Sequence, residues 1–157
     1  MSITIALEQP DTPDVIALIL ELDKVLEPLY PSESRHGFSI QKLLDEAVAF
    51  FVVRHNGQPA GCGGVQLLPD ADPPFAEVKR MYVRSDFRGM GMAKRILKQI
   101  EDYVSQHQIN VLRLETGIYQ KEAISLYEQV GFERIPPFGN YFVDPVSLCY
   151  EKRVNGL

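Results

Sequence analysis

The stretch from Glu77 to Leu97, EVKRMYVRSDFRGMGMAKRIL, decides the fold and the chemistry of this sequence. It starts with strand-forming residues, passes through a glycine-rich turn and continues with apolar residues at helical spacing. Glycine lets a backbone approach a ligand closely, and the first turn of a helix offers free N–H groups at the positive end of its dipole. The stretch therefore predicts a phosphate-binding turn between a strand and a helix.

Positive charge gathers in the same part of the chain. Residues 79–98 hold seven basic side chains and one acid, so this segment carries +6 while the whole chain of 157 residues carries −5. The basic residues are Lys79, Arg80, Arg84, Arg88, Lys94, Arg95 and Lys98. A small basic area in an acidic protein favours an anionic ligand of limited size. It argues against nucleic acid and anionic membranes as partners.

Strand and helix signals alternate along the chain and predict one mixed sheet covered by helices. The expected strands cover 3–7, 48–54, 59–67, 76–83, 111–115, 132–135 and 146–152, and the expected helices cover 13–29, 39–46, 93–104 and 120–129. The dipeptide Asn56-Gly57 predicts a tight hairpin. The fold class is α/β, a single domain over residues 1–157 with a mixed, mostly antiparallel sheet. Along the strand 76–83, simple alternation places Glu77 and Met81 on one face and Arg80 on the other.

The remaining composition excludes several classes of protein. Two cysteines, Cys62 and Cys149, are too few for a disulfide framework and read as buried free thiols. The N-terminus lacks a signal peptide, and the longest apolar run is too short to span a membrane, so the expected location is cytoplasmic. The three histidines are scattered without the spacing of metal ligands, so no metal is expected.

Three sequence elements resemble the GCN5-related N-acetyltransferases, the GNAT superfamily. Arg88-x-x-Gly91-x-Ala93 is similar to the loop that binds the acyl-CoA pyrophosphate in that family. Val78-x-x-Met81-Tyr82-Val83 is similar to its central strand, and AISLYEQVGF at 123–132 is similar to its A-x-x-L-Y-x-x-x-G-F signature. The resemblance is closest from Phe50 to Phe132 and fits the element order over the rest of the chain.

The resemblance implies an enzyme that moves an acetyl group from acetyl-CoA to an amine by direct attack in a ternary complex. The pyrophosphate would bind the backbone amides of Arg88, Gly89, Met90, Gly91, Met92 and Ala93. Main-chain groups of Met81 and Val83 would pair with the pantetheine arm like an added strand. Gln120 stands where many members carry an asparagine that contacts the pantetheine or an ordered water, so its amide is one methylene longer. Family members are often dimers, which makes a homodimer the expectation.

Tyr127 and Glu77 are the expected catalytic residues. Tyr127 would donate a proton to the leaving thiolate, and the alternative is a tyrosine packed in the core. Glu77 would take the proton of the acceptor amine, and the alternative is a surface carboxylate. Glu115, at a strand end that faces the cofactor cleft, could orient an ammonium group or assist its deprotonation.

The acceptor is expected to be a small molecule with both an amine and a carboxylate, such as an amino acid. Arg35 and Arg80 would bind the carboxylate, and Phe138 would wall the pocket unless it only plugs the core. Arg80 and Glu77 reach one cleft only if a β-bulge interrupts their strand. The competing hypothesis is a non-catalytic acyl-CoA sensor or partner subunit.

Overall fold

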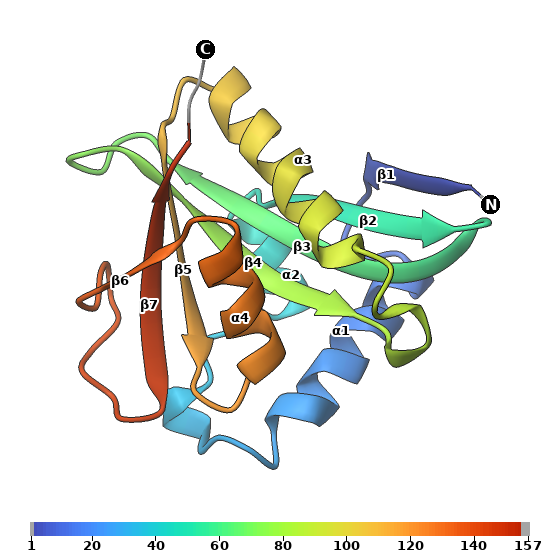
Figure 1. The fold of residues 1–157 in the computed structure, drawn as a ribbon, viewed down its shortest axis with the longest axis horizontal. Helices are drawn as coiled ribbons and strands as arrows, with labels where there is room; N and C mark the ends of the chain where they lie inside the picture. The colour runs from blue at the N-terminus through green and yellow to red at the C-terminus, as the bar shows by residue number, and fades with distance from the viewer. Residues whose placement is uncertain (1, 155–157) are drawn as a thin grey trace.

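The computed structural model describes residues 2–154, which form one seven-stranded sheet with helices on both faces (Figure 1). In chain order the elements are β1 (Ile3–Leu7), α1 (Pro13–Leu26), η1 (Ser32–Ser34), α2 (Ile40–Asp45), β2 (Ala49–His55), β3 (Gln58–Leu68), β4 (Phe75–Val83), η2 (Ser85–Phe87), α3 (Met92–Gln106), β5 (Val111–Gly117), α4 (Lys121–Gln129), β6 (Glu133–Ile135) and β7 (Ser147–Arg153). The strand order is β1-β2-β3-β4-β5-β7-β6, and only β4 and β5 pair in parallel. The predicted fold class and element order are confirmed.

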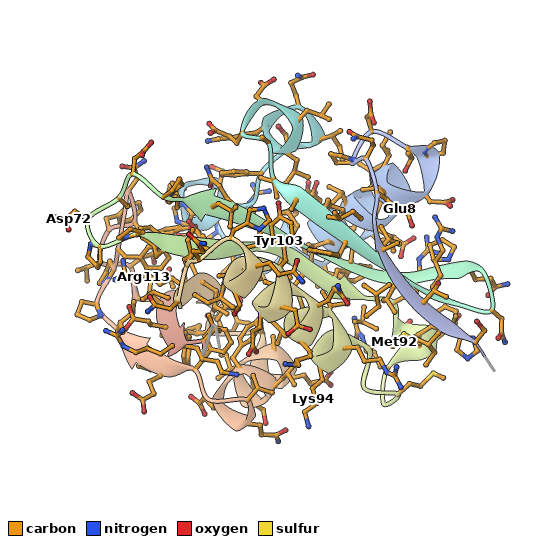
Figure 2. The ribbon with its side chains drawn as sticks, turned by 90° about the horizontal axis from the view of Figure 1, so that it is seen from above. Glu8, Asp72, Met92, Lys94, Tyr103 and Arg113 are labelled. Carbon is orange, nitrogen blue, oxygen red and sulfur yellow. The ribbon has the colours of Figure 1, made fainter. Side chains whose placement is uncertain are left out.

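The helices form two outer layers because each has one apolar face. Helices α1 and α2 bury Val15, Leu18 and Leu43 against β2 and β3. On the opposite face, α3 buries Ile96 and Ile100, and α4 contributes Tyr127 to the same larger cluster. Figure 2 shows the sheet between these two layers, with Met92 of α3 turned toward the core and Lys94 turned outward. The packed sheet therefore fixes the position of α1 on one face and of α3 and α4 on the other.

Local signals explain most element ends. Thr12 caps α1 through its side chain, which accepts from the N–H of Val15, and Pro13 follows in the first turn. The predicted helix end at residue 29 is wrong, because α1 stops at Leu26. Pro28 has no N–H to continue the intrahelical hydrogen bonds. The expected hairpin is confirmed, with positive φ at both Asn56 (50°) and Gly57 (84°).

A β-bulge in β4 changes which side chains share a face of the sheet. Lys79 pairs with Gly64 and Tyr82 with Cys62, so two residues of β4 oppose the single Gly63 of β3. One of the two, Arg80, has a φ of 56°. An extra residue in one strand shifts the alternation of side chains beyond it.

The expected alternation along β4 is therefore wrong beyond Lys79. Met81 packs with the cluster under α3, on the face opposite Glu77. Arg80 turns to the α1 side of the sheet, where its guanidinium pairs with Asp23. The β-bulge thus places Glu77 and Arg80 on one face of the sheet, which simple alternation along the strand would not do.

Strands β4 and β5 separate soon after they meet. Their parallel ladder contains two residue pairs, Ala76 with Leu112 and Glu77 with Arg113. Beyond these pairs the strands splay apart toward their carboxyl ends (Figure 1). The opening lies at the centre of the sheet, in a place where open α/β sheets bind their ligands.

Both cysteines are buried free thiols, as expected. No helix in the described part of the chain is long and apolar enough to cross a membrane. Between residues 2 and 154 there is also no group of three or more His, Cys, Asp or Glu side chains arranged to hold a metal ion.

Candidate active site

A groove of about 720 Å³ runs from the start of α3 to α4 and ends at the opening between β4 and β5. Its lining includes the end of β4, the glycine-rich turn and the near side of α4: Met81, Tyr82, Val83, Phe87, Arg88, Gly89, Gly91, Met92, Ala93, Lys94, Tyr119, Gln120, Lys121, Glu122, Ala123, Leu126, Tyr127 and Gln129, with Leu22, Val25 and Leu29 of the α1 region opposite. Of the residues expected to bind acetyl-CoA, only Met90 is absent from this lining.

The glycine-rich turn presents a row of free amides to the groove. Gly91 is the N-cap of the 15-residue helix α3 and has a φ of 74°, and Gly89 has a φ of 77°. In the described chain, the N–H groups of residues 89–94 donate no backbone hydrogen bond. A Cβ on Gly91 would have no atom within 4 Å, so the space above the turn is open. This arrangement fits a pyrophosphate.

Fewer basic side chains of segment 79–98 are free of acidic partners than the sequence predicts. Four of its seven cations are paired: Lys79 with Glu77, Arg80 with Asp23, Arg84 with Glu21 and Lys98 with Asp102. Arg88, Lys94 and Arg95 make no ion pair with residues 2–154. Nε of Arg88 donates to the carbonyl of Val83 at 3.0 Å, which ties the turn to the end of β4. The unpaired positive charge thus lies around the free amides.

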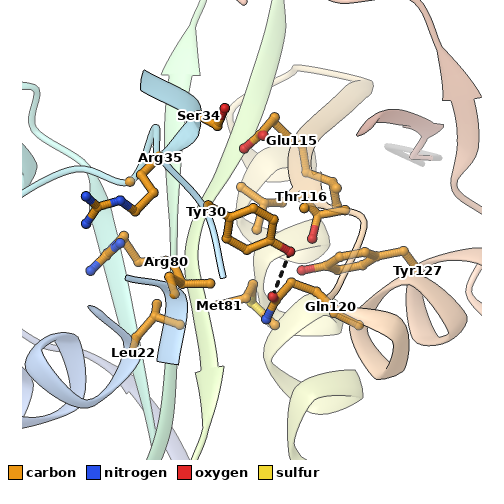
Figure 3. Close-up of a pocket in the computed structure, with 16 residues that line it drawn as sticks. Leu22, Tyr30, Ser34, Arg35, Arg80, Met81, Glu115, Thr116, Gln120 and Tyr127 are labelled. Carbon is orange, nitrogen blue, oxygen red and sulfur yellow. Dashed lines mark hydrogen bonds between the residues drawn. The ribbon is translucent and has the colours of Figure 1, made fainter. Parts of the chain in front are cut away.

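A smaller pocket of about 130 Å³ occupies the opening between β4 and β5 (Figure 3). Its walls come from α1 and the following loop (Leu22, Leu26, Tyr30, Ser34, Arg35, Gly37), from β4 (Val78, Arg80, Met81), from β5 (Leu114, Glu115, Thr116, Gly117) and from α4 with its N-cap (Gln120, Ala123, Tyr127). Five residues line both the pocket and the groove: Leu22, Met81, Gln120, Ala123 and Tyr127. The pocket and the groove therefore meet, and we call the place where they meet the junction.

Glu115 supplies the carboxylate of the pocket. The hydroxyl of Ser147 donates to its Oε2 at 2.6 Å. Burial raises the pKa of Glu115 to about 7, against the lowering effect of the Ser147 hydrogen bond, and the nearby Glu77 adds to the rise. A carboxyl group in this range exchanges protons near neutral pH, as a general base or acid must.

Tyr127 lies at the junction, near the C-terminal end of α4. The ring is buried and packs edge-on against Phe132, with ring centroids 5.7 Å apart. Burial raises the pKa of its phenol, and the Glu115 charge raises it further. Its hydroxyl has no hydrogen-bond partner among residues 2–154, and in Figure 3 it points toward the pocket. The ring thus packs in the core while its hydroxyl points toward the pocket. Its role as a proton donor stays a prediction.

Two arginines line the pocket on the side opposite Glu115, and in Figure 3 their guanidinium groups extend toward the outer edge of that side. Arg80 is buried, and its Nη2 donates to Asp23 and, at 3.5 Å, to the carbonyl of Ile19. Its Nε is buried and has no partner in the described structure. Arg35 lies in the loop after α1, and its only ion pair there is a 4.0 Å contact with Glu27.

The structure does not bring Glu77 into the lining of the pocket or the groove. Its carboxylate is buried on the same face as Arg80, where Nζ of Lys79 lies 2.9 Å from Oε2 and the hydroxyl of Tyr141 donates to the same oxygen. A carboxylate held by an ammonium and a phenol is already satisfied as an acceptor. This arrangement differs from the expected free base.

Phe138 also lies away from the pocket. It is buried in a small cluster with Phe75, Val111 and Cys149, and its ring meets that of Phe75 edge-on at 5.5 Å. This placement corresponds to the alternative in which Phe138 closes the end of the core.

Sequence reasoning missed several wall residues, above all Tyr30, Thr116 and Gly117. Tyr30 is buried although it begins a polar loop. Its hydroxyl donates to Oε1 of Gln120 and accepts from the N–H of Tyr119, both at 2.9 Å. The only signal for it in the sequence was an aromatic residue directly after an amphipathic helix.

The chain is similar to known acetyltransferases over almost its whole length. Residues 15–132 match the model of the Acetyltransferase (GNAT) family. An IAA acetyltransferase of Azospirillum brasilense is 42% identical over 151 residues, which cover 96% of this chain and 97% of that protein. A solved structure of a proposed acyl-CoA N-acyltransferase from Klebsiella pneumoniae is 31% identical, with a TM-score of 0.80 and coverage of 98% of both chains.

A more distant structure shares the fold. The PaiA N-acetyltransferase of Thermoplasma acidophilum, solved in complex with coenzyme A, is 21% identical, with a TM-score of 0.76 over 98% of this chain and 99% of that one. The acetyl donor of the GNAT family is acetyl-CoA. The family match over most of the chain and the relative of 42% identity agree with the free amides of the turn and with the splayed strands. This chain belongs to the GNAT family of acyl-CoA-dependent N-acetyltransferases.

Proposed function

We propose that this enzyme transfers the acetyl group of acetyl-CoA to the primary amine of a small acceptor that also carries a carboxylate, by direct attack in a ternary complex. The observation that carries the proposal is the junction, where the long groove and the small pocket share Met81, Gln120 and Tyr127. An acyl group at the end of the groove would meet an amine in the pocket without a covalent enzyme intermediate. Holding both reactants in one site makes the attack effectively unimolecular.

Glu115 is the general base of this proposal, in place of Glu77. An acceptor amine is protonated at neutral pH and must lose a proton before it attacks. The raised pKa of Glu115, about 7, brings the carboxylate closer to the pKa of an amine, so the proton transfer is less unfavourable than to an ordinary carboxylate. Its position in the pocket wall also allows it to bind the ammonium form first.

Tyr127 is the general acid. Its hydroxyl is at the junction, and burial, which raises the pKa of the phenol, keeps it protonated at neutral pH. The hydroxyl can therefore donate a hydrogen bond to the sulfur as negative charge develops on the departing CoA thiolate, and supply a proton to it. The expected contribution is modest, because a thiolate is already a fair leaving group.

The charge and size of the pocket support an acceptor with a carboxylate. Arg35 and Arg80 are on one side and Glu115 is on the other, so a molecule with both signs of charge is complementary to the walls. Arg35 is the stronger candidate for a carboxylate anchor, because its single ion pair is long, whereas Arg80 is bound by Asp23. A volume of about 130 Å³ favours a metabolite over a peptide.

A thiol-release assay with acetyl-CoA and a panel of acceptors tests the proposal. The panel contains amino acids, their methyl esters, spermidine and, because a relative carries its name, IAA. We expect free acids to give the highest kcat/KM. Esters that match the acids, or spermidine that exceeds both, would refute the anionic acceptor. No thiol release above the uncatalysed rate with any acceptor would refute the whole proposal.

A further inference from the structure

Tyr30 connects the acceptor side of the site to the cosubstrate side. It begins the loop that supplies Ser34 and Arg35 to the pocket, yet its hydroxyl binds the turn between β5 and α4, which borders the groove. The partners are the backbone N–H of Tyr119 and the side chain of Gln120, each at 2.9 Å. Gln120 is the polar side chain that this contact holds at the junction.

The backbone of the fold leaves a fitted space for the Tyr30 ring. A Cβ on Gly117 would lie 2.1 Å from the ring atoms of Tyr30, so only glycine leaves room there. The ring is buried, and the Tyr119 ring lies beside it with centroids 5.5 Å apart. Burial also raises the pKa of Tyr30, so its proton stays in place at neutral pH. The hydroxyl is therefore a fixed donor and acceptor.

The hydrogen bonds of that hydroxyl decide the orientation of the Gln120 amide. A phenol has one proton to donate, and its oxygen already accepts from Tyr119. Only the carbonyl end of Gln120 can receive the proton. In the flipped orientation the hydroxyl would accept twice, and its own buried proton would have no acceptor, which is costly. Figure 3 shows Oε1 at the dashed bond, with the amide nitrogen turned away from the Tyr30 ring.

We propose that Tyr30 is a positioning residue that holds Gln120 so that its Nε2–H group donates into the junction, to a carbonyl oxygen of the bound acetyl-CoA. The inference rests on the proposed function, since the junction is where the acyl end of the cosubstrate would lie. A free glutamine side chain samples many rotamers and loses that freedom on binding. The Tyr30 contact removes the freedom before the ligand arrives. A residue of the acceptor loop thus acts on the cosubstrate.

A double-mutant cycle tests the coupling. Tyr30→Phe keeps the ring in its fitted space and removes the hydroxyl, and Gln120→Leu removes the amide at similar size. We expect each single change to weaken acetyl-CoA binding about five- to tenfold, the effect of one lost hydrogen bond, and the double change to weaken it no further. The dissociation constant is measured by calorimetry without acceptor, so the result does not depend on which acceptor, if any, is correct.

A third variant separates orientation from stability. Gln120→Glu keeps an oxygen for the Tyr30 proton but replaces the donating amide by an acceptor, and we expect it to lose at least as much affinity as Gln120→Leu. Tyr103→Phe, which removes a phenol from α3 far from the junction, is the matched control and should bind normally. Three results would each overturn the proposal. The first is a double variant whose loss of acetyl-CoA affinity equals the product of the two single losses. The others are unchanged affinity in Tyr30→Phe and normal affinity in Gln120→Glu.

Discussion

The exchange of Glu115 for glutamine should make the protein more stable at alkaline pH while it slows the reaction. Glutamine keeps the shape and can still accept the hydrogen bond of Ser147, but it carries no charge. Folding raises the pKa of Glu115 from 4.5 to about 7. Between these values the folded state holds a proton that the unfolded state releases, so stability falls as pH rises through this window and stays lower above it.

The size of the effect follows from the shift. At about 1.4 kcal/mol for each pKa unit the penalty at high pH is at most about 3.5 kcal/mol, and solvent near this partly exposed group lowers it toward about 1 kcal/mol. Urea unfolding at pH 5 and pH 8.5 measures it. We expect the advantage of Glu115→Gln to grow by about 1–3 kcal/mol between the two values. Glu133→Gln, on an exposed carboxylate of β6, should show no such growth.

Kinetics supply the second half of this test. If Glu115 takes the proton from a bound ammonium, kcat/KM of the native enzyme should rise with pH up to about 7 and then level off. The variant must wait for acceptor that is already deprotonated in solution, so its kcat/KM should keep rising toward the higher pKa of the amine. A stability difference independent of pH, or parallel rate profiles, would refute the assignment of Glu115 as a general base with a raised pKa.

Three further changes probe the remaining parts of the site. Gly91→Val should abolish CoA binding in calorimetry, because a branched side chain strains a positive φ and fills the open space above the amides; normal affinity would exclude the turn as the pyrophosphate site. Tyr127→Phe should lower kcat roughly ten- to a thousandfold with little change in CoA affinity. If it instead loses stability and keeps its rate, the residue only packs. Arg35→Ala should lower kcat/KM about tenfold or more for a free amino acid and leave its methyl ester almost unaffected; equal losses for both would exclude Arg35 as the anchor.

Local sequence signals predicted the elements of this fold because each acts over a few residues. Asn56-Gly57 fixes a hairpin wherever it occurs between two strands, and the glycine-rich turn before Ala93 marks a helix start without knowledge of the tertiary structure. The end of α1 was misplaced because the apolar spacing continues to Leu29, while Pro28 removes an N–H. The spacing of apolar residues alone does not show that one backbone N–H donor is missing.

The site itself depended on contacts that no local pattern contains. The bulge at Arg80 becomes visible only when β3 is paired with β4, and it moves Met81 to the opposite face. The ammonium of Lys79 forms an ion pair with the carboxylate of Glu77, two residues away in the strand, and burial raises the pKa of Glu115. Both effects arise from three-dimensional surroundings. The sequence could therefore name the carboxylates but could not decide which of them is free to exchange a proton.

The short ladder between β4 and β5 has a consequence for the lifetime of the enzyme. In the described sheet only two residue pairs of the backbone ladder join β4 to β5, although one apolar cluster packs side chains from both strands. A cosubstrate that lies in the opening would therefore add contacts to both strands where the ladder is missing. Binding at a concentration a hundred times the dissociation constant adds about 2.7 kcal/mol to the stability of the folded state. Amides along both strands should then exchange hydrogen more slowly, and proteases should cut the chain less often. Abundance of this protein would in that way follow the supply of acetyl-CoA.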